Sequence, residues 1–265
     1  MTVMERLQEH YEEAKLHFPE DRIVGIFLQG SQNYGLDTEF SDVDTKLVVV
    51  PTFEQLAMNA PGPVSTTYIR DNEEHIDFKD VRLMLQLFKK QNMNFLEILF
   101  TPYKIINPLY EDAWNKLVTH REVIARYNVV TNIRSMKGVA LEKYHAMEHR
   151  YPAKVAVIDK FGYDPKQLHH LFRVEEYIER YLKGEDYETC MLPRDPEYLK
   201  GVKLGSFNLE QARYAGKKAI DHVTEMVDNA VETLESVNNA YVDALINGVQ
   251  YEIMKIAITE ELTNE

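Results

Sequence analysis

The sequence predicts an α+β protein in which a small mixed β-sheet unit is followed by an α-helical unit. Short β-rich runs bounded by turn residues occur only in the first part of the chain. After about residue 108 these runs disappear, and long alternations of charged and apolar residues indicate helices. We therefore expect two domains, residues 1–108 and residues 109–265, and the 45% hydrophobic content is sufficient for a core in each.

The first domain begins with a helix, because apolar side chains recur there at helical spacing. β-rich runs on either side of a polar, glycine-containing loop predict two strands, and two further runs flank a turn at Asp71-Asn72. Asp80 is a suitable N-cap for the helix that follows. The expected elements, in chain order, are a helix at 3–17, strands at 21–29, 42–50, 65–70 and 73–78, and helices at 81–91 and 94–100.

The second domain is expected to be helical throughout, with breaks at Tyr151-Pro152 and over residues 190–206. We predict its helices at 111–150, 165–183, 208–234 and 238–262. The last two alternate Glu and Lys, a pattern typical of a bundle face or of a contact between copies of the chain. A homo-oligomer formed through these C-terminal helices is one of the two alternatives.

The overall charge is acidic, with 30 Lys and Arg against 43 Asp and Glu and a net charge of −13. Such a surface does not attract nucleic acid as a whole, although a local basic groove for RNA is compatible with it. Cys190 is the single cysteine, which excludes an internal disulfide and fits a reducing compartment. No apolar run has the length of a membrane span, and the first residues lack a signal-peptide core. We expect a cytoplasmic protein without membrane contact.

Five residues on three short segments carry the predicted chemistry. Gly30-Ser31 follows a strand, where glycine lets backbone N–H groups approach a ligand, and these groups with the Ser31 hydroxyl can hold a triphosphate. Asp42 and Asp44 are two residues apart at the start of a strand, which puts both carboxylates on one face. Asp77 lies between apolar residues on another strand and is expected to project to the same side.

Three carboxylates on one side repel each other unless cations lie between them. Hard oxygen ligands suit Mg²⁺, which also binds substrate phosphates, and Mn²⁺ is the alternative ion. The set Asp42, Asp44 and Asp77 with a phosphate grip therefore predicts two metal ions and phosphoryl transfer, with the three carboxylates as metal ligands and catalytic residues.

The ordered motif resembles the polymerase-beta nucleotidyltransferase superfamily. Gly-Ser-x-x-Tyr-Gly followed by Ser-Asp-x-Asp is similar to its bacterial and phage branch associated with RNA repair and RNA ligase genes. The segments NMNFLEILF, YDPKQLHHLFRVEEYI and YLKGVKLGSFNLEQA extend the resemblance over most of residues 22–215. It implies a palm-like sheet domain and transfer of a nucleoside monophosphate from a nucleoside triphosphate to an acceptor hydroxyl, while the last 50 residues match nothing familiar.

A line of basic residues on the predicted helix 165–183 is the second half of the expected site. Lys166, His170 and Arg173 share one helix face, where they can neutralise the triphosphate and the leaving pyrophosphate. The alternative is a solvated face with one buried histidine. We expect the nucleotide in a cleft between the two domains, with Gly30-Ser31 on one side and this line on the other. Glu97, in an apolar helix, is a buried partner of one of the basic residues, a support behind a metal ligand, or a solvent-exposed residue.

Three functions fit these residues. The first is an enzyme that adds a nucleoside monophosphate to an RNA end or to a small molecule. The second is a nucleotidyltransferase that modifies a protein, as antitoxin-type enzymes do. The third is a nucleotide-binding regulator without catalysis, against which the three carboxylates argue. The sequence decides neither the nucleotide nor the acceptor.

Overall fold

The computed structural model describes residues 2–39, 41–59 and 62–264, which form two compact units. The first unit consists of Met1–Asn33, Phe40–Tyr127 and Asn238–Glu265, and the second of Tyr34–Glu39 and Asn128–Val237. The predicted domain boundary at residue 108 therefore differs from the observed division. Residues 109–127 and the C-terminal helix group with the sheet, and a short loop from the first half groups with the helices.

The first unit is built on a mixed five-stranded sheet of order β3-β4-β2-β1-β5. Strands β2 and β4 are parallel, and the other neighbours are antiparallel. The strands are β1 (Ile23–Gln29), β2 (Asp44–Val49), β3 (Ser65–Ile69), β4 (His75–Asp80) and β5 (Lys104–Ile106). A mixed sheet followed by a long helical part confirms the predicted fold class.

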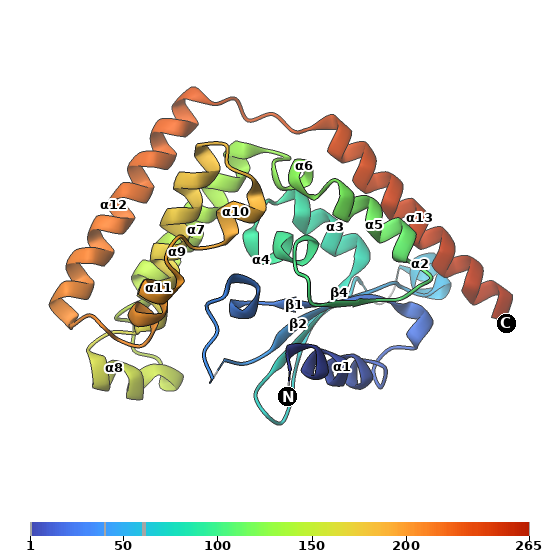
Figure 1. Ribbon diagram of the computed structural model, residues 1–265. Coiled ribbons are helices and arrows are strands. Elements are labelled where there is room, and N and C mark those ends of the chain that lie inside the picture. The colour runs from blue at the N-terminus through green and yellow to red at the C-terminus, as the bar shows by residue number, and fades with distance from the viewer. Residues whose placement is uncertain (1, 40, 60–61, 265) are drawn as a thin grey trace. The chain divides into compact units, whose positions relative to one another are not determined.

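Helix α1 (Val3–Ala14) covers one face of this sheet. Thr2 and Glu5 form a capping box at its start, which satisfies two free backbone N–H groups. Its buried residues Leu7 and Tyr11 pack with alternate residues of the central strands, such as Leu47 and Ile76, in one hydrophobic core. The other residues of β2 and β4 must therefore face away from α1, and Figure 1 shows α3 and α4 on that side.

The helices on the second face begin where β4 ends. The Asp80 carboxylate accepts a hydrogen bond from the Arg82 N–H and caps α3, as predicted. The C-terminal helix packs beside α5 and α3 (Figure 1). This unit also contains the helices η1 (Glu20–Arg22), α2 (Phe53–Met58), α3 (Val81–Lys89), α4 (Met93–Leu96), η3 (Glu97–Leu99), α5 (Glu111–Thr119), α6 (Arg121–Ala125) and α13 (Ala240–Asn264).

The second unit is helical, with α9 at its centre. Helix α9 (Pro165–Leu182) packs against α7, α10, α11 and α12. These neighbours are α7 (Val129–Ala146), α10 (Tyr187–Met191), α11 (Pro196–Lys203) and α12 (Leu209–Thr233), and α8 (Val155–Phe161) precedes α9. Within the described residues, no helix is long and apolar enough to cross a membrane.

Most predicted elements are present, and the differences have local causes. The strand β2 begins at Asp44, so Asp42 and Val43 precede it. Strand β5 and the short helices α2, α8, α10 and α11 were not predicted, because each is too short to show a repeated apolar pattern. The predicted helix 111–150 is three helices, and Asn128 caps the third.

Candidate active site

The predicted carboxylates Asp42 and Asp44 lie at the amino end of β2. Val43 between them is fully buried, Asp42 is exposed, and the Asp44 side chain is 41% exposed. The Asp44 Oδ1 accepts a hydrogen bond from the His75 N–H at 3.1 Å. The Asp42 carbonyl accepts one from the Gln32 side chain at 2.7 Å. Both carboxylates are therefore held on an ordered segment and remain accessible to solvent.

Asp77 lies on the neighbouring strand β4, directly beside Lys46 in the parallel register. Alternation along the two strands puts Asp44, Lys46 and Asp77 on the same face of the sheet, away from α1. The Lys46 Nζ is 3.2 Å from one Asp77 oxygen, and the Lys79 Nζ is 2.6 Å from the other. Two lysines therefore balance the charge of Asp77.

The chemistry of this donor set fits Mg²⁺, because carboxylate oxygens are its preferred protein ligands. The positions of Asp42, Asp44 and Asp77 are less suitable for an ion than their chemistry. Among the described residues, no group of three or more His, Cys, Asp or Glu side chains is arranged closely enough to hold a metal ion. Asp42 and Asp44 are accessible for an ion, whereas Asp77 would have to exchange an ammonium partner for it.

At the predicted phosphate-binding site Gly30-Ser31, only some of the hydrogen-bond donors are available to a ligand. Gly30 has φ of +102°, a conformation that favours glycine, and nothing lies within 4 Å of the position of a Cβ. Its N–H, however, donates to the buried Glu97 carboxylate at 3.3 Å. Glu97 is therefore buried rather than exposed to solvent, and it holds the Gly30 N–H at the start of the loop. The Ser31 hydroxyl has no hydrogen-bond partner among the residues described, so it can bind a ligand.

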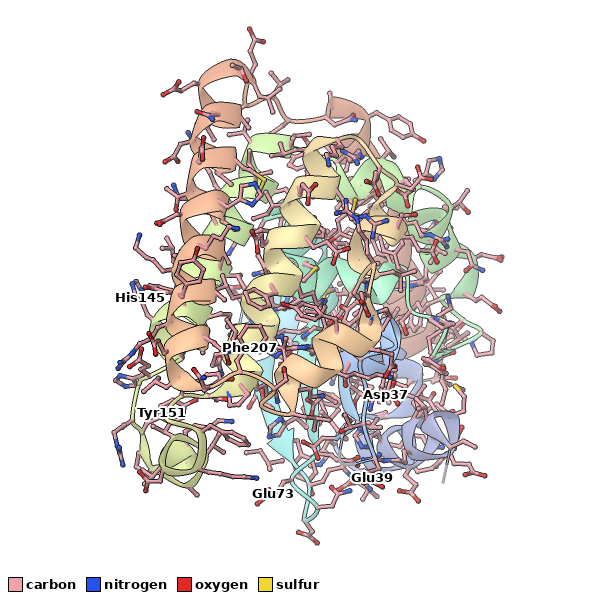
Figure 2. All side chains as sticks on the ribbon, turned by 60° about the vertical axis from the view of Figure 1, so that its left-hand side comes forward. Asp37, Glu39, Glu73, His145, Tyr151 and Phe207 are labelled. Atoms are coloured by element: carbon pink, nitrogen blue, oxygen red, sulfur yellow. The ribbon has the colours of Figure 1, made fainter. Side chains whose placement is uncertain are left out.

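Helix α9 of the second unit carries the predicted basic residues Lys166, His170 and Arg173 at positions i, i+4 and i+7, which share one helix face. The Arg173 guanidinium lies 3.6 Å from the centre of the Tyr34 ring, three residues after Ser31 in the sequence. Lys203 of α11, which was not predicted, donates to the Leu36 carbonyl at 3.3 Å. The loop of residues 34–39 is thus fixed to this unit by two cations, while its Asp37 and Glu39 are exposed (Figure 2).

The two adjacent histidines of α9 carry no charge near neutral pH. Burial, and to a smaller extent the nearby cations Arg173, Lys203 and Lys166, lowers the pKa of His169 to about 4. The His169 ring donates to the Leu199 carbonyl at 2.8 Å, so it is the buried structural histidine. Burial also lowers the pKa of His170 well below its usual value. His170 therefore offers a neutral imidazole, which corrects its predicted role as a cation.

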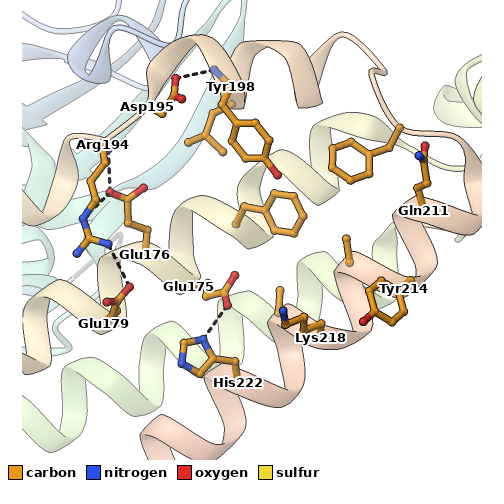
Figure 3. A pocket seen from close by; sticks show the side chains of 15 residues that line it. Glu175, Glu176, Glu179, Arg194, Asp195, Tyr198, Gln211, Tyr214, Lys218 and His222 are labelled. Carbon is orange, nitrogen blue, oxygen red and sulfur yellow. Dashed lines mark hydrogen bonds and ion pairs between the residues drawn. The ribbon is translucent and has the colours of Figure 1, made fainter.

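A separate pocket of about 660 Å³ lies within the second unit (Figure 3). Its lining includes the rings of Phe172, Tyr198 and Phe207, and three of its four carboxylates have basic partners. Arg194 contacts Glu176 and Glu179, and His222 contacts Glu175. No predicted site residue lines this pocket, which lies along a different face of α9 from Lys166 and Arg173.

The residues that sequence reasoning missed are partners of the predicted ones. Lys46 contacts Asp77 and His75 contacts Asp44, while Lys203 contacts the loop of residues 34–39. His75 and Lys46 carried a signal, because each is two residues from a predicted carboxylate on its own strand and therefore shares its face. Lys203 lies in the late segment YLKGVKLGS, which resembles the superfamily branch described above.

Comparison with known proteins gives a family match to the first two thirds of the chain. Residues 1–174 match RlaP, described as the RNA repair pathway DNA polymerase beta family. All of the predicted site residues lie within this range. A crystal structure of a nucleotidyltransferase-like protein from Exiguobacterium sibiricum 255-15 is similar at 12% identity and a TM-score of 0.31, covering 95% of this chain and 80% of that one. No curated protein matches the sequence.

Proposed function

Because the chain belongs to the RNA repair pathway DNA polymerase beta family, we propose that it transfers a nucleoside monophosphate from a nucleoside triphosphate to a terminal hydroxyl of RNA. The observation that carries this proposal is the position of Asp44 and Asp77. They lie on one face of two adjacent parallel strands, with the exposed Asp42 next to them. The family supports a nucleotidyltransferase in RNA repair, and the RNA acceptor is the finer part of the proposal.

The proposed reaction joins the acceptor to the α-phosphate. The hydroxyl oxygen forms a bond to the α-phosphorus, and the bond from that phosphorus to the oxygen bridging to the β-phosphate breaks. Pyrophosphate leaves with the electron pair, and the hydroxyl proton passes to the Asp77 carboxylate. Mg²⁺ or Mn²⁺ held by Asp42, Asp44 and Asp77 would supply stabilisation of the phosphate charge.

Residues of several segments have roles in this proposal. The Ser31 hydroxyl is the proposed ligand of the triphosphate, with Glu97 holding the preceding glycine in place. The residues Lys166, His170 and Arg173, which share one face of α9, are the proposed source of further positive charge and hydrogen bonds for a triphosphate. The acidic net charge of −13 makes a local contact with an RNA end more favourable than binding along a duplex.

One observation favours a second candidate, the nucleotide-binding regulator without catalysis. Asp77 is balanced by two ammonium groups, and a carboxylate in such a pair is stable without a metal ion. In this alternative the triphosphate binds and no transfer follows.

The test is a transfer assay with each of the four labelled nucleoside triphosphates, Mg²⁺ or Mn²⁺, and a short single-stranded RNA. The control RNA has a blocked 3′ end, and the control enzyme is the Asp44→Asn variant. Labelled RNA one or more nucleotides longer, absent from both controls, supports the proposal. Label that appears on protein instead would assign the protein-modifying alternative. Triphosphate binding without any labelled product would assign the regulator.

A further inference from the structure

A buried carboxylate lies directly behind the segment that carries Asp42 and Asp44. Glu74 is the residue before β4 and is 1% exposed. Its Oε1 accepts a hydrogen bond from the Val43 N–H at 3.0 Å. The Val43 amide is the peptide between the two predicted metal ligands. Glu74 is thus bound to the backbone at the centre of the Asp-Val-Asp motif.

The charge of Glu74 is balanced by partners from α1 and from the β3–β4 turn. The guanidinium groups of Arg6 and Arg70 form ion pairs with it, and Asn72 donates to its Oε2 at 2.8 Å. His10 is 2.9 Å from Oε2 and 3.0 Å from the Thr45 hydroxyl. Because a carboxylate only accepts hydrogen bonds, the His10 Nε2 carries the proton. These hydrogen bonds and ion pairs satisfy both oxygens of the Glu74 carboxylate, and this allows the charged group to be buried.

Neighbouring contacts hold the rest of the same segment. Arg6 donates to the Ser41 carbonyl at 3.4 Å, and the His75 N–H donates to the Asp44 carboxylate. Glu74 and His75 are consecutive, so the start of β4 binds both the backbone and one side chain of the motif. The segment 41–44 is therefore fixed by hydrogen bonds at each of its residues, including the one from Gln32 to Asp42.

We propose that Glu74 is a positioning residue for the metal-binding carboxylates, a role that rests on the proposed function. Its carboxylate fixes the Val43 amide and thereby the spacing and direction of Asp42 and Asp44. It touches neither the ion nor the substrate. Groups that orient metal ligands in this way change metal affinity or activity by about 10-fold to 100-fold when they are removed.

The test measures Mn²⁺ binding to the full chain, without nucleotide, by the electron paramagnetic resonance signal of the free ion. Glu74→Met keeps the length of the side chain but removes the acceptor for the Val43 N–H. We expect the Mn²⁺ dissociation constant to rise by about 10-fold to 100-fold. Glu74→Gln retains an acceptor oxygen and is expected to keep most of the affinity. Wild-type affinity in a folded Glu74→Met variant would overturn the proposal.

Asp80→Asn is the matched control, because Asp80 is also a buried carboxylate of β4 paired with an arginine. It caps α3 and does not contact the segment 41–44, so its loss should lower stability and leave Mn²⁺ affinity unchanged. An equal loss of affinity in the control would show a merely structural role. If Glu74→Met does not fold, Glu74→Asp keeps the charge but withdraws the acceptor from Val43. Wild-type affinity in that variant would equally refute positioning.

The failure of this inference is distinguishable from failure of the proposed function. If the wild-type chain binds no Mn²⁺, the metal assignment itself is wrong. If the wild type binds Mn²⁺ and transfers nucleotides while the Glu74 variants bind equally well, only the positioning role is wrong. In active variants, the Mg²⁺ concentration for half-maximal rate should rise more than the KM for the triphosphate at saturating Mg²⁺.

Discussion

Replacing Lys46 by methionine should strengthen metal binding while it weakens the fold. The Lys46 ammonium lies 3.2 Å from Asp77 and 4.7 Å from the centre of the Phe95 ring, and its side chain is 4% exposed. At that distance, and with an effective dielectric constant of about 20, the attraction to Asp77 is about 5 kcal/mol before desolvation of both groups. Methionine fills a similar volume and keeps the contact with the ring. The Lys46→Met variant therefore loses charge but little packing.

Two opposite effects follow from this exchange. The free energy of unfolding should fall by about 1–3 kcal/mol, because Asp77 loses one of its charged partners. A metal ion at Asp77 no longer has to displace the Lys46 ammonium. If the ion recovers about 1.4 kcal/mol of that attraction, its dissociation constant falls about tenfold.

The assay is a Mn²⁺ titration together with thermal unfolding in the absence and presence of the ion. Lys104→Met is the control, since Lys104 is a partly buried lysine of the same sheet, on strand β5 and two strands away from β2. An unchanged or weaker affinity for Mn²⁺ in folded Lys46→Met would refute competition between the ammonium and the ion at Asp77.

Three further outcomes are expected. Asp44→Asn should abolish transfer and leave the thermal midpoint nearly unchanged, since it removes an accessible anionic ligand but almost no volume; transfer close to the wild-type rate would exclude Asp44 as a ligand. Arg173→Ala should weaken triphosphate binding by about 1.5–3 kcal/mol, as expected for a lost charged hydrogen bond. The control Arg213→Ala loses only a surface ion pair with Glu148 and should leave triphosphate binding unchanged. Equal effects of the two variants in a binding titration would argue against the role of Arg173. Stability should fall as the pH is lowered from about 6.5 to 4, because the pKa of His10 and of His169 is lowered to about 4 by burial and the unfolded chain binds these protons more readily. The loss is up to about 3 kcal/mol for each histidine, and denaturant unfolding of His169→Asn should show a shallower pH dependence than the wild type.

The motif could be predicted because its geometry is local. Asp42 and Asp44 flank the buried Val43, and a pattern of accessible and buried residues at adjacent positions can be recognised in the sequence alone. The pairing of Lys46 with Asp77 could not be predicted in the same way. It depends on the parallel register of β2 and β4, which joins residues 31 positions apart. The sequence shows each strand but not which strands are neighbours.

Helix α13 illustrates a second limit of prediction. Its buried residues Val242, Ile246, Val249 and Ile253 recur at helical spacing, so the helix itself was predictable. That pattern does not specify the surface it packs against, and the predicted domain boundary assigned it to the helical half. Strand β5 was missed because its three residues are all partly buried and show no alternation.

The place of α13 gives the helical unit the topology of an insertion. Residues 128–237 leave the sheet unit after Tyr127 and return at Asn238, and the Asn239 N–H donates to the Tyr127 carbonyl at 3.0 Å. The chain thus departs and re-enters at a single hydrogen-bonded junction, where a short linker could replace the whole insertion. The loop of residues 34–39 is a second segment that leaves the sheet unit and joins the helical unit, where Arg173 and Lys203 contact it. An evolutionary exchange of the insertion therefore requires matching changes in this six-residue loop between the Gly-Ser and Asp-Val-Asp segments.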